Sequence, residues 1–339
     1  MKKVRVGIAG LGRMGKSHAA NLAYKVKNAE LVAACSVVPA ELEWSLENLG
    51  LDALFDNFED MLRHAHLDAV FLVTPTTLHP QHIIAALQAG LHVFCEKPLA
   101  LTMADCERVM AMREQYPERV ATIGFVRRYD PEYAYAKRKI EEGAIGRPIL
   151  FRAQTADMDN TAAFQVQFSK TSGGVFLDAS IHDMDLARWL LDAEVQEVYC
   201  VGDCYVHEGF REYQDADNAT ALYRFDNGAA ASITVSRTTL HGHDTFAEVT
   251  GTQGSLIIGR PNRVANVDIC DQHGMRIECV PTFYERFEKA FLLEAEDFVN
   301  CALHGGRPRC DLRDAVQATR VAIATTEAYR SGKVVSLAV

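Results

Sequence analysis

Val4-Arg5-Val6-Gly7-Ile8-Ala9-Gly10-Leu11-Gly12-Arg13-Met14-Gly15 is the stretch that decides the fold. Its apolar start predicts a short strand, and the run after Gly12 predicts a helix that extends to about Lys25. A GxGxxG motif between a strand and a helix is typical of a dinucleotide-binding turn. There the first glycine permits a tight bend, the second lets a pyrophosphate approach the backbone, and the third lets helix and strand pack closely. We favour this interpretation over a glycine-rich turn without a ligand.

Strands and helices alternate from this turn to about Gly124. Further apolar runs predict strands at 31–38, 68–74, 92–95 and 120–123, and helices at 80–88 and from 102 onward. Gly90 would end the first of these helices, and Thr102 with Asp105 resembles the capping box that opens a helix. The alternation predicts an α/β domain over residues 1–124, a doubly wound parallel sheet with helices on both faces.

After Gly124 the pattern changes. We expect a helix at 131–142, an extended run at 148–155, a polar loop to Ser172, a helix at 179–191, and helices at 284–303 and 311–331. Asn227-Gly228 and Gln272-His273-Gly274 predict hairpin turns between strands. These features indicate an α+β domain over residues 125–339 with an open, mainly antiparallel sheet. Whether the last helix packs back on the first domain stays open.

The composition is that of an ordinary globular protein, with 339 residues, 48% hydrophobic and 24% charged. A net charge of −10 leaves no basic stripe to neutralise the phosphates of a nucleic acid. No apolar run approaches the ~20 residues of a membrane span, and no signal peptide is visible. The nine cysteines include no CxxC pair, which favours reduced thiols. We therefore expect a cytoplasmic protein that binds neither nucleic acid nor membranes.

Lys97 follows a predicted strand within Glu96-Lys97-Pro98. The carboxyl ends of the strands are where an open α/β sheet binds its ligand. A lysine at this edge is suited to stabilise the alkoxide of a substrate hydroxyl. The alternative is a solvated strand end, which the neighbouring motifs make less favoured.

Asp178 and His182 form a second candidate cluster, at the start of a predicted helix. They are four residues apart, so they share one face of that helix. A histidine beside a carboxylate is suited to act as a general base, since its pKa lies near working pH. The competing interpretation makes Asp178 a helix cap and His182 a structural polar residue.

His241 and His243 resemble a pair of metal ligands, but the spacing supplies no third ligand. A hairpin or substrate-loop role is favoured, and we expect no metal.

The choice of cofactor depends on the end of the second strand. An NAD site usually carries an acid there, about 20 residues after the glycine motif, but here the residues are Cys35-Ser36-Val37. Ser36 is able to hydrogen-bond a hydroxyl or a phosphate, and it would not repel a 2′-phosphate. Arg13 would reach such a phosphate, or it is only a solvated residue at the helix start. The residues therefore exclude neither NAD nor NADP.

Four segments together resemble the Gfo/Idh/MocA oxidoreductase family, which includes glucose–fructose oxidoreductase and inositol dehydrogenases. They are GLGRMGKSHAANL (10–22), EKPLA (96–100), GFVRRYDP (124–131) and GGVFLDASIHDMDLARW (173–189). Their order and spacing extend over essentially the whole chain. Within the family the chain is most similar to the inositol 2-dehydrogenases and scyllo-inositol dehydrogenases.

The resemblance implies a Rossmann domain followed by an open-faced sheet domain, assembled as a homotetramer through the sheets. It implies a catalytic trio of Lys97, Asp178 and His182, in which His182 accepts the hydroxyl proton, Asp178 orients it and Lys97 polarises the reacting oxygen. The expected substrate-binding residues are this trio with Val126, Arg127 and Asp157. The expected cofactor-binding residues are Gly10, Gly12, Arg13, Met14, Gly15, Ser36, Val37, Thr74, Pro75, His79, Glu96 and Lys97.

The function that follows is NAD(P)-dependent oxidation of a secondary ring hydroxyl of a cyclic polyol, myo- or scyllo-inositol, with NAD favoured by the resemblance. One alternative is an aldose or keto-sugar oxidoreductase that uses the same residues. Another is a dinucleotide-binding sensor without catalysis, against which the trio argues.

Overall fold

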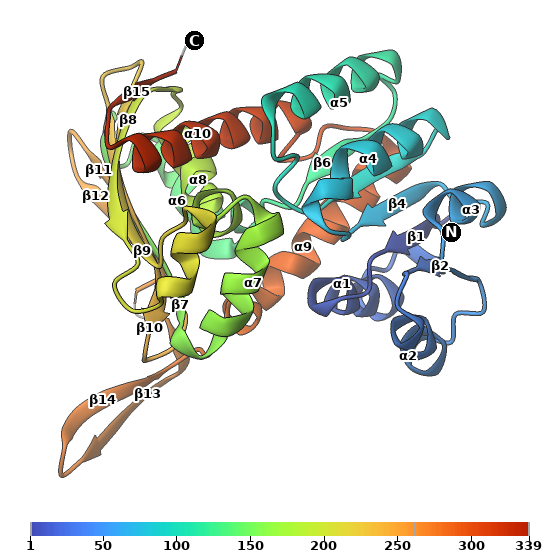
Figure 1. Cartoon of the computed structure of the whole chain (residues 1–339), viewed down its shortest axis with the longest axis horizontal. Helices are drawn as coiled ribbons and strands as arrows, with labels where there is room; N and C mark the ends of the chain where they lie inside the picture. Colours follow the sequence, from blue (N-terminus) through green and yellow to red (C-terminus); the bar gives the residue numbers. More distant parts are fainter. Residues whose placement is uncertain (1, 261, 338–339) are drawn as a thin grey trace. The chain divides into compact units, whose positions relative to one another are not determined.

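The computed structural model describes residues 2–260 and 262–337, and the chain divides into two compact units (Figure 1). The first unit runs to Tyr129 and includes Lys289–Thr319. The second comprises Asp130–Glu288 and the segment from Arg320. This division differs from a single boundary after Gly124, because a long C-terminal segment belongs to the first unit.

The first unit contains a six-stranded parallel sheet in the order β3-β2-β1-β4-β5-β6. The strands are β1 (Val4–Ala9), β2 (Ala29–Cys35), β3 (Leu54–Phe55), β4 (Ala69–Leu72), β5 (His92–Cys95) and β6 (Ala121–Ile123). The chain reverses its direction of travel across the sheet between β1 and β4, and such a switch point is where ligands bind. The prediction of a doubly wound parallel sheet is confirmed.

The helices of the first unit connect these strands. They are α1 (Arg13–Tyr24), α2 (Pro39–Leu49), α3 (Phe58–His64), α4 (His79–Gln88) and α5 (Met103–Gln115), with short turns η1 (Thr76–Leu78) and η2 (Val126–Tyr129). Thr102 caps α5 by accepting from the Asp105 backbone, as the sequence predicts. Gly90 follows α4 with φ +76°, which confirms its helix-ending role.

The core of the first unit is built from two distant parts of the chain. Val6, Ile8 and Phe71 come from central strands, which are buried on both faces as parallel strands usually are. Phe298 and its neighbours Ala295 and Val299 come from α9 (Phe283–His304). The Phe298 ring meets Phe71 edge-on with ring centroids 5.3 Å apart.

The second unit contains a seven-stranded sheet in the order β12-β11-β7-β10-β9-β8-β15. The strands are β7 (Pro148–Met158), β8 (Val195–Asp203), β9 (Asn218–Phe225), β10 (Ala230–Thr239), β11 (Asp244–Gly251), β12 (Ser255–Ile258) and β15 (Val335–Ser336). Only β7 and β10 pair in parallel, so the predicted, mainly antiparallel sheet is confirmed. Strands β13 (Arg263–Asp271) and β14 (Gly274–Cys279) form a separate hairpin (Figure 1).

One face of the large sheet is covered and the other is open. The helical elements of this unit are α6 (Pro131–Glu141), α7 (Ala162–Ser172), α8 (Ile181–Leu191) and the end of α10 (Leu312–Ser331), with turns η3 (Asp159–Thr161), η4 (Phe176–Ser180) and η5 (Glu208–Tyr213). Helix α8 packs on β7 and β10. Along β9, buried residues such as Ala221 and Tyr223 alternate with the exposed Leu222 and Arg224, as expected for a half-covered sheet.

Two local predictions for this unit are wrong. Residues 162–172 form α7 and not a polar loop; Phe164 and Phe168, one turn apart, stack at 5.6 Å, and Gly173 ends the helix at φ +84°. Asp178 does not cap a helix. It lies inside the π-helical turn η4, which continues directly into α8.

No helix within residues 2–260 and 262–337 combines the length and apolar character that crossing a membrane requires.

Candidate active site

The glycine turn between β1 and α1 has the geometry that a dinucleotide needs. Gly10 has φ +87°, and a Cβ on Gly15 would lie 2.0 Å from the Gly10 carbonyl oxygen. A Cβ on Gly12, in contrast, would meet no atom within 4 Å. Gly12 is the N-cap of α1, whose first turn contains Arg13 and Met14 but no acidic residue. Open space before an uncapped helix start fits a pyrophosphate group.

The end of β2 adjoins this turn, because the Gly10 N–H donates to the Cys35 carbonyl. Ser36 is buried and Val37 is exposed. The Ser36 hydroxyl donates to Glu41 Oε2 at 2.5 Å, and its oxygen accepts from the Val38 N–H at 3.1 Å. An acid is therefore present at this strand end, although it comes from α2.

The turn after β5 carries Lys97, and the peptide between Lys97 and Pro98 is cis. The side chain of Glu96 points into the protein: its carboxylate accepts from the Lys97 N–H at 3.1 Å and hydrogen-bonds His18 Nε2 at 2.9 Å. A Cβ on Gly124 would lie 3.2 Å from this carboxylate, so the packing there is close. Glu96 therefore fixes the turn, while Lys97 is half-buried at the sheet edge.

His18, Glu96 and Glu294 form a buried polar cluster behind that turn. Glu294 Oε1 lies 3.9 Å from His18 Nε2, and the His18 ring contacts Phe71, Phe94 and Phe291. Among the described residues, these three are the group that offers ligands for a metal ion. An ion bound between His18 and Glu96 would have to break their direct hydrogen bond.

Protonation in this cluster is uneven. Burial, together with the nearby Glu96 charge, raises the pKa of Glu294 well above its usual range. Burial also disfavours the Glu96 charge, but the hydrogen bond and charge of His18, with Lys97, outweigh it and lower the pKa of Glu96. Glu294 thus holds a proton while Glu96 is ionised.

His79 joins the loop after β4 to the Lys97 turn. Its Nδ1 lies 2.8 Å from the Pro98 carbonyl oxygen and its Nε2 lies 2.8 Å from the Thr74 carbonyl oxygen. Burial lowers the pKa of His79, while the two carbonyls act in the opposite direction. The ring therefore ties Thr74 and Pro98 together from within, at the strand ends that flank the glycine turn.

Asp178 and His182 lie in the second unit on one continuous helical segment, η4 followed by α8. Behind Asp178 is the fully buried Arg237, whose Nη2 lies 3.9 Å from Asp178 Oδ2. Arg237 Nη1 binds Asp215 Oδ2 at 2.7 Å, and Asp215 accepts from the Val175 N–H at 2.9 Å. This network holds the backbone just before η4 and places a cation beside Asp178.

The buried His243 contacts two side chains, and one of them is Asp157. His243 Nδ1 lies 2.9 Å from Asp157 Oδ1, and its Nε2 lies 2.6 Å from Thr245 Oγ1. His243 and the exposed His241 lie in the loop between β10 and β11. The hairpin interpretation is wrong, because β7 lies between these two strands in the sheet.

Val126 and Arg127 lie in η2 and are buried. The neighbouring Arg128 binds Asp314 at 3.2 Å and the Arg309 carbonyl at 3.1 Å. Asp130, two residues further on, caps α6 and binds Arg286.

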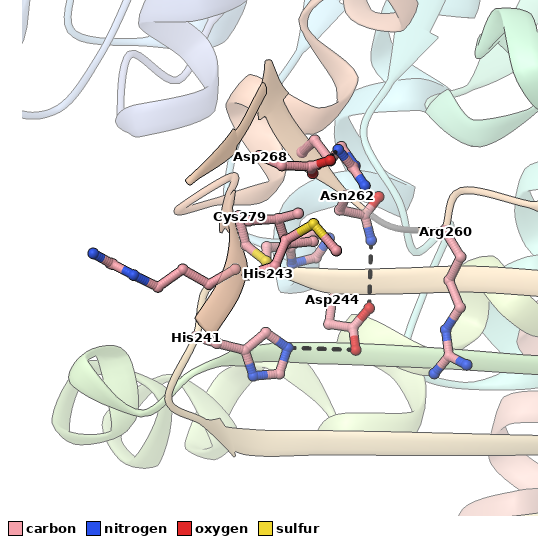
Figure 2. Close-up of a pocket in the computed structure, with 11 residues that line it drawn as sticks. His241, His243, Asp244, Arg260, Asn262, Asp268 and Cys279 are labelled. Carbon is pink, nitrogen blue, oxygen red and sulfur yellow. Dashed lines mark hydrogen bonds and ion pairs between the residues drawn. The ribbon is translucent and has the colours of Figure 1, made fainter. Parts of the chain in front are cut away.

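Figure 2 shows a pocket at the base of the β13–β14 hairpin, with a volume of about 750 Å³. His241, His243 and Asp244 line it with residues of the hairpin, and a dashed line joins Asp244 to Asn262. The described residues that line it include none of the predicted catalytic trio. We therefore do not assign the chemistry to this pocket.

The structure gathers most predicted cofactor residues at one edge of the first sheet. Those linked there by the contacts above are Gly10, Ser36, Thr74, His79 and Glu96. Asp157, Asp178 and His182 belong to the second unit. Sequence reasoning missed Glu41, although an acid just after Pro39 signals a helix start. It missed Arg237 and Glu294 because their partners are distant in sequence.

Two family profiles match the chain. Residues 4–124 match "Oxidoreductase family, NAD-binding Rossmann fold", and residues 137–337 match "Oxidoreductase family, C-terminal alpha/beta domain". The chain belongs to the Gfo/Idh/MocA oxidoreductase family.

Relatives of this family match over nearly the whole chain. A scyllo-inositol 2-dehydrogenase (NAD⁺) of Bacillus subtilis is 39% identical over 99% of this chain and 96% of its own length. A myo-inositol 2-dehydrogenase of Thermotoga maritima is 32% identical over 98% of each chain. The crystal structure of scyllo-inositol dehydrogenase from Lactobacillus casei, with bound NAD(H) and scyllo-inositol, is 37% identical, covers 99% of both chains and has a TM-score of 0.96.

Proposed function

We propose that this chain oxidises a secondary ring hydroxyl of an inositol to the ketone, with NAD as the hydride acceptor. The observation that carries the proposal is the full-length similarity to enzymes named for this reaction. The glycine turn supports it independently, since the open space at Gly12 fits a dinucleotide.

The proposed chemistry divides one oxidation among three side chains. His182 accepts the proton of the reacting hydroxyl, Asp178 orients the imidazole, and Lys97 stabilises negative charge on the oxygen. The bound nicotinamide supplies a ring that accepts the hydride leaving the same carbon. The alcohol becomes a ketone by losing one proton, to His182, and one hydride, to the nicotinamide. The buried Arg237 places a guanidinium beside the Asp178 carboxylate, which supports a positioning role for Asp178.

The remaining site residues are assigned to binding of the dinucleotide and of the polyol. We assign the dinucleotide to Gly10, Gly12, Arg13, Met14, Gly15, Ser36, Val37, Thr74 and Pro75, with His79 and Glu96 holding the loops from behind. Val126, Arg127 and Asp157 are assigned to the polyol. Asp157 is suited to accept from a ring hydroxyl because His243 fixes one of its oxygens.

The substrate experiment measures steady-state rates with scyllo-inositol, myo-inositol, glucose, galactose and lactate, each with NAD. We expect scyllo-inositol to have the highest kcat/KM, because two relatives named for it are 39% and 37% identical, whereas two named for myo-inositol are 33% and 32% identical. Turnover of glucose alone would move the function to an aldose oxidoreductase. Turnover of lactate with none of any cyclitol would overturn the proposal.

The open face of the large sheet supports self-association, which we propose to be a homotetramer in the cytoplasm. Exposed apolar side chains on this sheet include Leu150, Tyr199, Leu222 and Ile257. The nine cysteines include no CxxC pair, which suits a reducing compartment. Light scattering after size-exclusion chromatography tests the assembly: Leu222→Lys, which puts a charge beside Tyr199, should reduce the mass. A monomeric wild type would contradict the tetramer.

A further inference from the structure

We infer that Glu41, in the first turn of α2, is the acid that recognises the adenosine ribose and makes this site select NAD over NADP. The inference rests on the proposed function, because it concerns the dinucleotide that the glycine turn would bind. It goes beyond the sequence argument, in which Ser36 excludes neither NAD nor NADP.

The hydroxyl of Ser36 is already engaged. It occupies the strand end where an NAD site usually has its acid, but its single proton goes to Glu41 Oε2 at 2.5 Å. Its oxygen accepts from the Val38 N–H at 3.1 Å. Ser36 therefore has no proton to donate to a phosphate. Its effect is to hold the Glu41 carboxylate at the position that the missing acid would occupy.

Local structure explains why Glu41 reaches this place. Pro39 opens α2 at its first position, and the Glu41 N–H donates to the Val38 carbonyl at 3.0 Å. An acidic side chain in the first turn is favoured by the helix dipole. With Oε2 bound to Ser36, Oε1 is left to accept from the 2′- or 3′-hydroxyl of a ribose.

The charges around the end of β2 oppose a 2′-phosphate. Burial, with the nearby Asp56 charge, raises the pKa of the Cys35 thiol to about 11, so a second acid lies close to this strand end. Lys16, a nearby cation of α1, is engaged elsewhere, since its ammonium lies over the Trp44 ring at 4.9 Å from the ring centroid. A 2′-phosphate would bring up to two negative charges beside Glu41 and would have no hydroxyl proton to offer it. Arg13, exposed at the start of α1, is the cation that would have to compensate.

The test measures the Kd of NAD⁺ and of NADP⁺ for the full chain by isothermal titration calorimetry, without any polyol. Wild type should bind NAD⁺ at least tenfold more tightly. Glu41→Gln removes the charge and keeps the shape, so NADP⁺ should bind roughly tenfold more tightly while NAD⁺ changes little. Glu41→Ala also removes the acceptor, so NAD⁺ should weaken roughly tenfold as well.

Two further variants separate the ribose contact from general charge effects. Glu43→Gln removes the same charge from an exposed position on α2 and should leave both constants unchanged. Arg13→Ala should leave the preference for NAD⁺ in place.

A Glu41→Gln protein with the wild-type ratio of the two constants would overturn the inference and leave polyol oxidation standing. Conversely, a ratio that shifts as expected in a protein without polyol turnover would preserve the inference while the proposed function fails. A wild type that binds neither dinucleotide would overturn both.

Discussion

Lys97 and His182 are the side chains whose replacement tests the chemistry most directly. Lys97→Ala and His182→Ala should each nearly abolish turnover, with a loss on the order of 10²–10⁴ for the general base, because a positioned proton acceptor is worth about that much. Neither residue belongs to the glycine turn, so NAD binding should persist. The measurement is kcat at saturating substrate, alongside the calorimetric Kd for NAD⁺. A variant with near wild-type kcat would remove that residue from the chemistry.

Glu294 should make the stability of the protein depend on pH. Its folded-state pKa is raised, chiefly by burial, so the unfolded chain releases this proton at a lower pH than the folded chain does. The stabilising contribution is present below the unfolded pKa, near 4.5, and is lost as the pH rises through the folded pKa. Glu294→Gln should therefore flatten the fall in the guanidinium midpoint between pH 5 and pH 8.

The control for that titration is Glu296→Gln, two residues along α9 and half-buried. It should keep the wild-type pH profile. Equal profiles for wild type and Glu294→Gln would mean that Glu294 is ionised in the folded protein.

The sequence predicts a role for single residues where chemistry and a motif coincide, as at Lys97, Asp178 and His182, and those roles stay predictions. They were not predictable where a role depends on a distant partner. Arg237 contacts Asp215 and Asp178, neither of which lies on its own strand. Nothing in the sequence around Arg237 indicates that it is fully buried.

At the scale of elements, the turn between β1 and α1 allows two alanine substitutions with opposite effects. Gly15→Ala would push a methyl group against the Gly10 carbonyl at 2.0 Å, so it should cost about 1–3 kcal/mol of stability. Gly12→Ala meets no atom within 4 Å and should change stability by less than about 0.5 kcal/mol. It should nevertheless weaken NAD⁺ binding, because the methyl group occupies the path of the pyrophosphate.

Thermal unfolding measures the stability of the two variants, and isothermal titration calorimetry measures their Kd for NAD⁺. If Gly12→Ala bound NAD⁺ as wild type does, the pyrophosphate would not approach this glycine.

Elements with a strong apolar period or a turn signal were predicted well, including β4, β5 and the Asn227-Gly228 hairpin. Short or polar ones were not. Helix α7 has a mixed composition, and the stacking of Phe164 on Phe168 within it is not revealed by a polarity pattern. The π-helical turn η4 was not predicted either, and the residue just before it, Val175, is held by Asp215, which lies 40 residues away in the sequence.

At the scale of the whole molecule, the first unit should not fold from its N-terminal segment alone. A fragment of residues 1–129 lacks Ala295, Phe298 and Val299, all fully buried in its core. Loss of a single buried Phe costs about 3–5 kcal/mol, a large part of the stability of a domain. We expect no cooperative thermal transition by circular dichroism for this fragment. The control joins residues 289–319 to it through a flexible linker, which should restore the transition.

The same arrangement determines when the dinucleotide half matures during translation. Its glycine motif emerges from the ribosome well before α9, and Phe298 and its neighbours emerge only after every strand of the seven-stranded sheet except β15 has been made. The N-terminal strands therefore keep an exposed apolar surface around Phe71 and Phe94 until Phe298 has been made. The core beneath the glycine turn is consequently complete only after α9 has been made, and we expect the cofactor to bind only then.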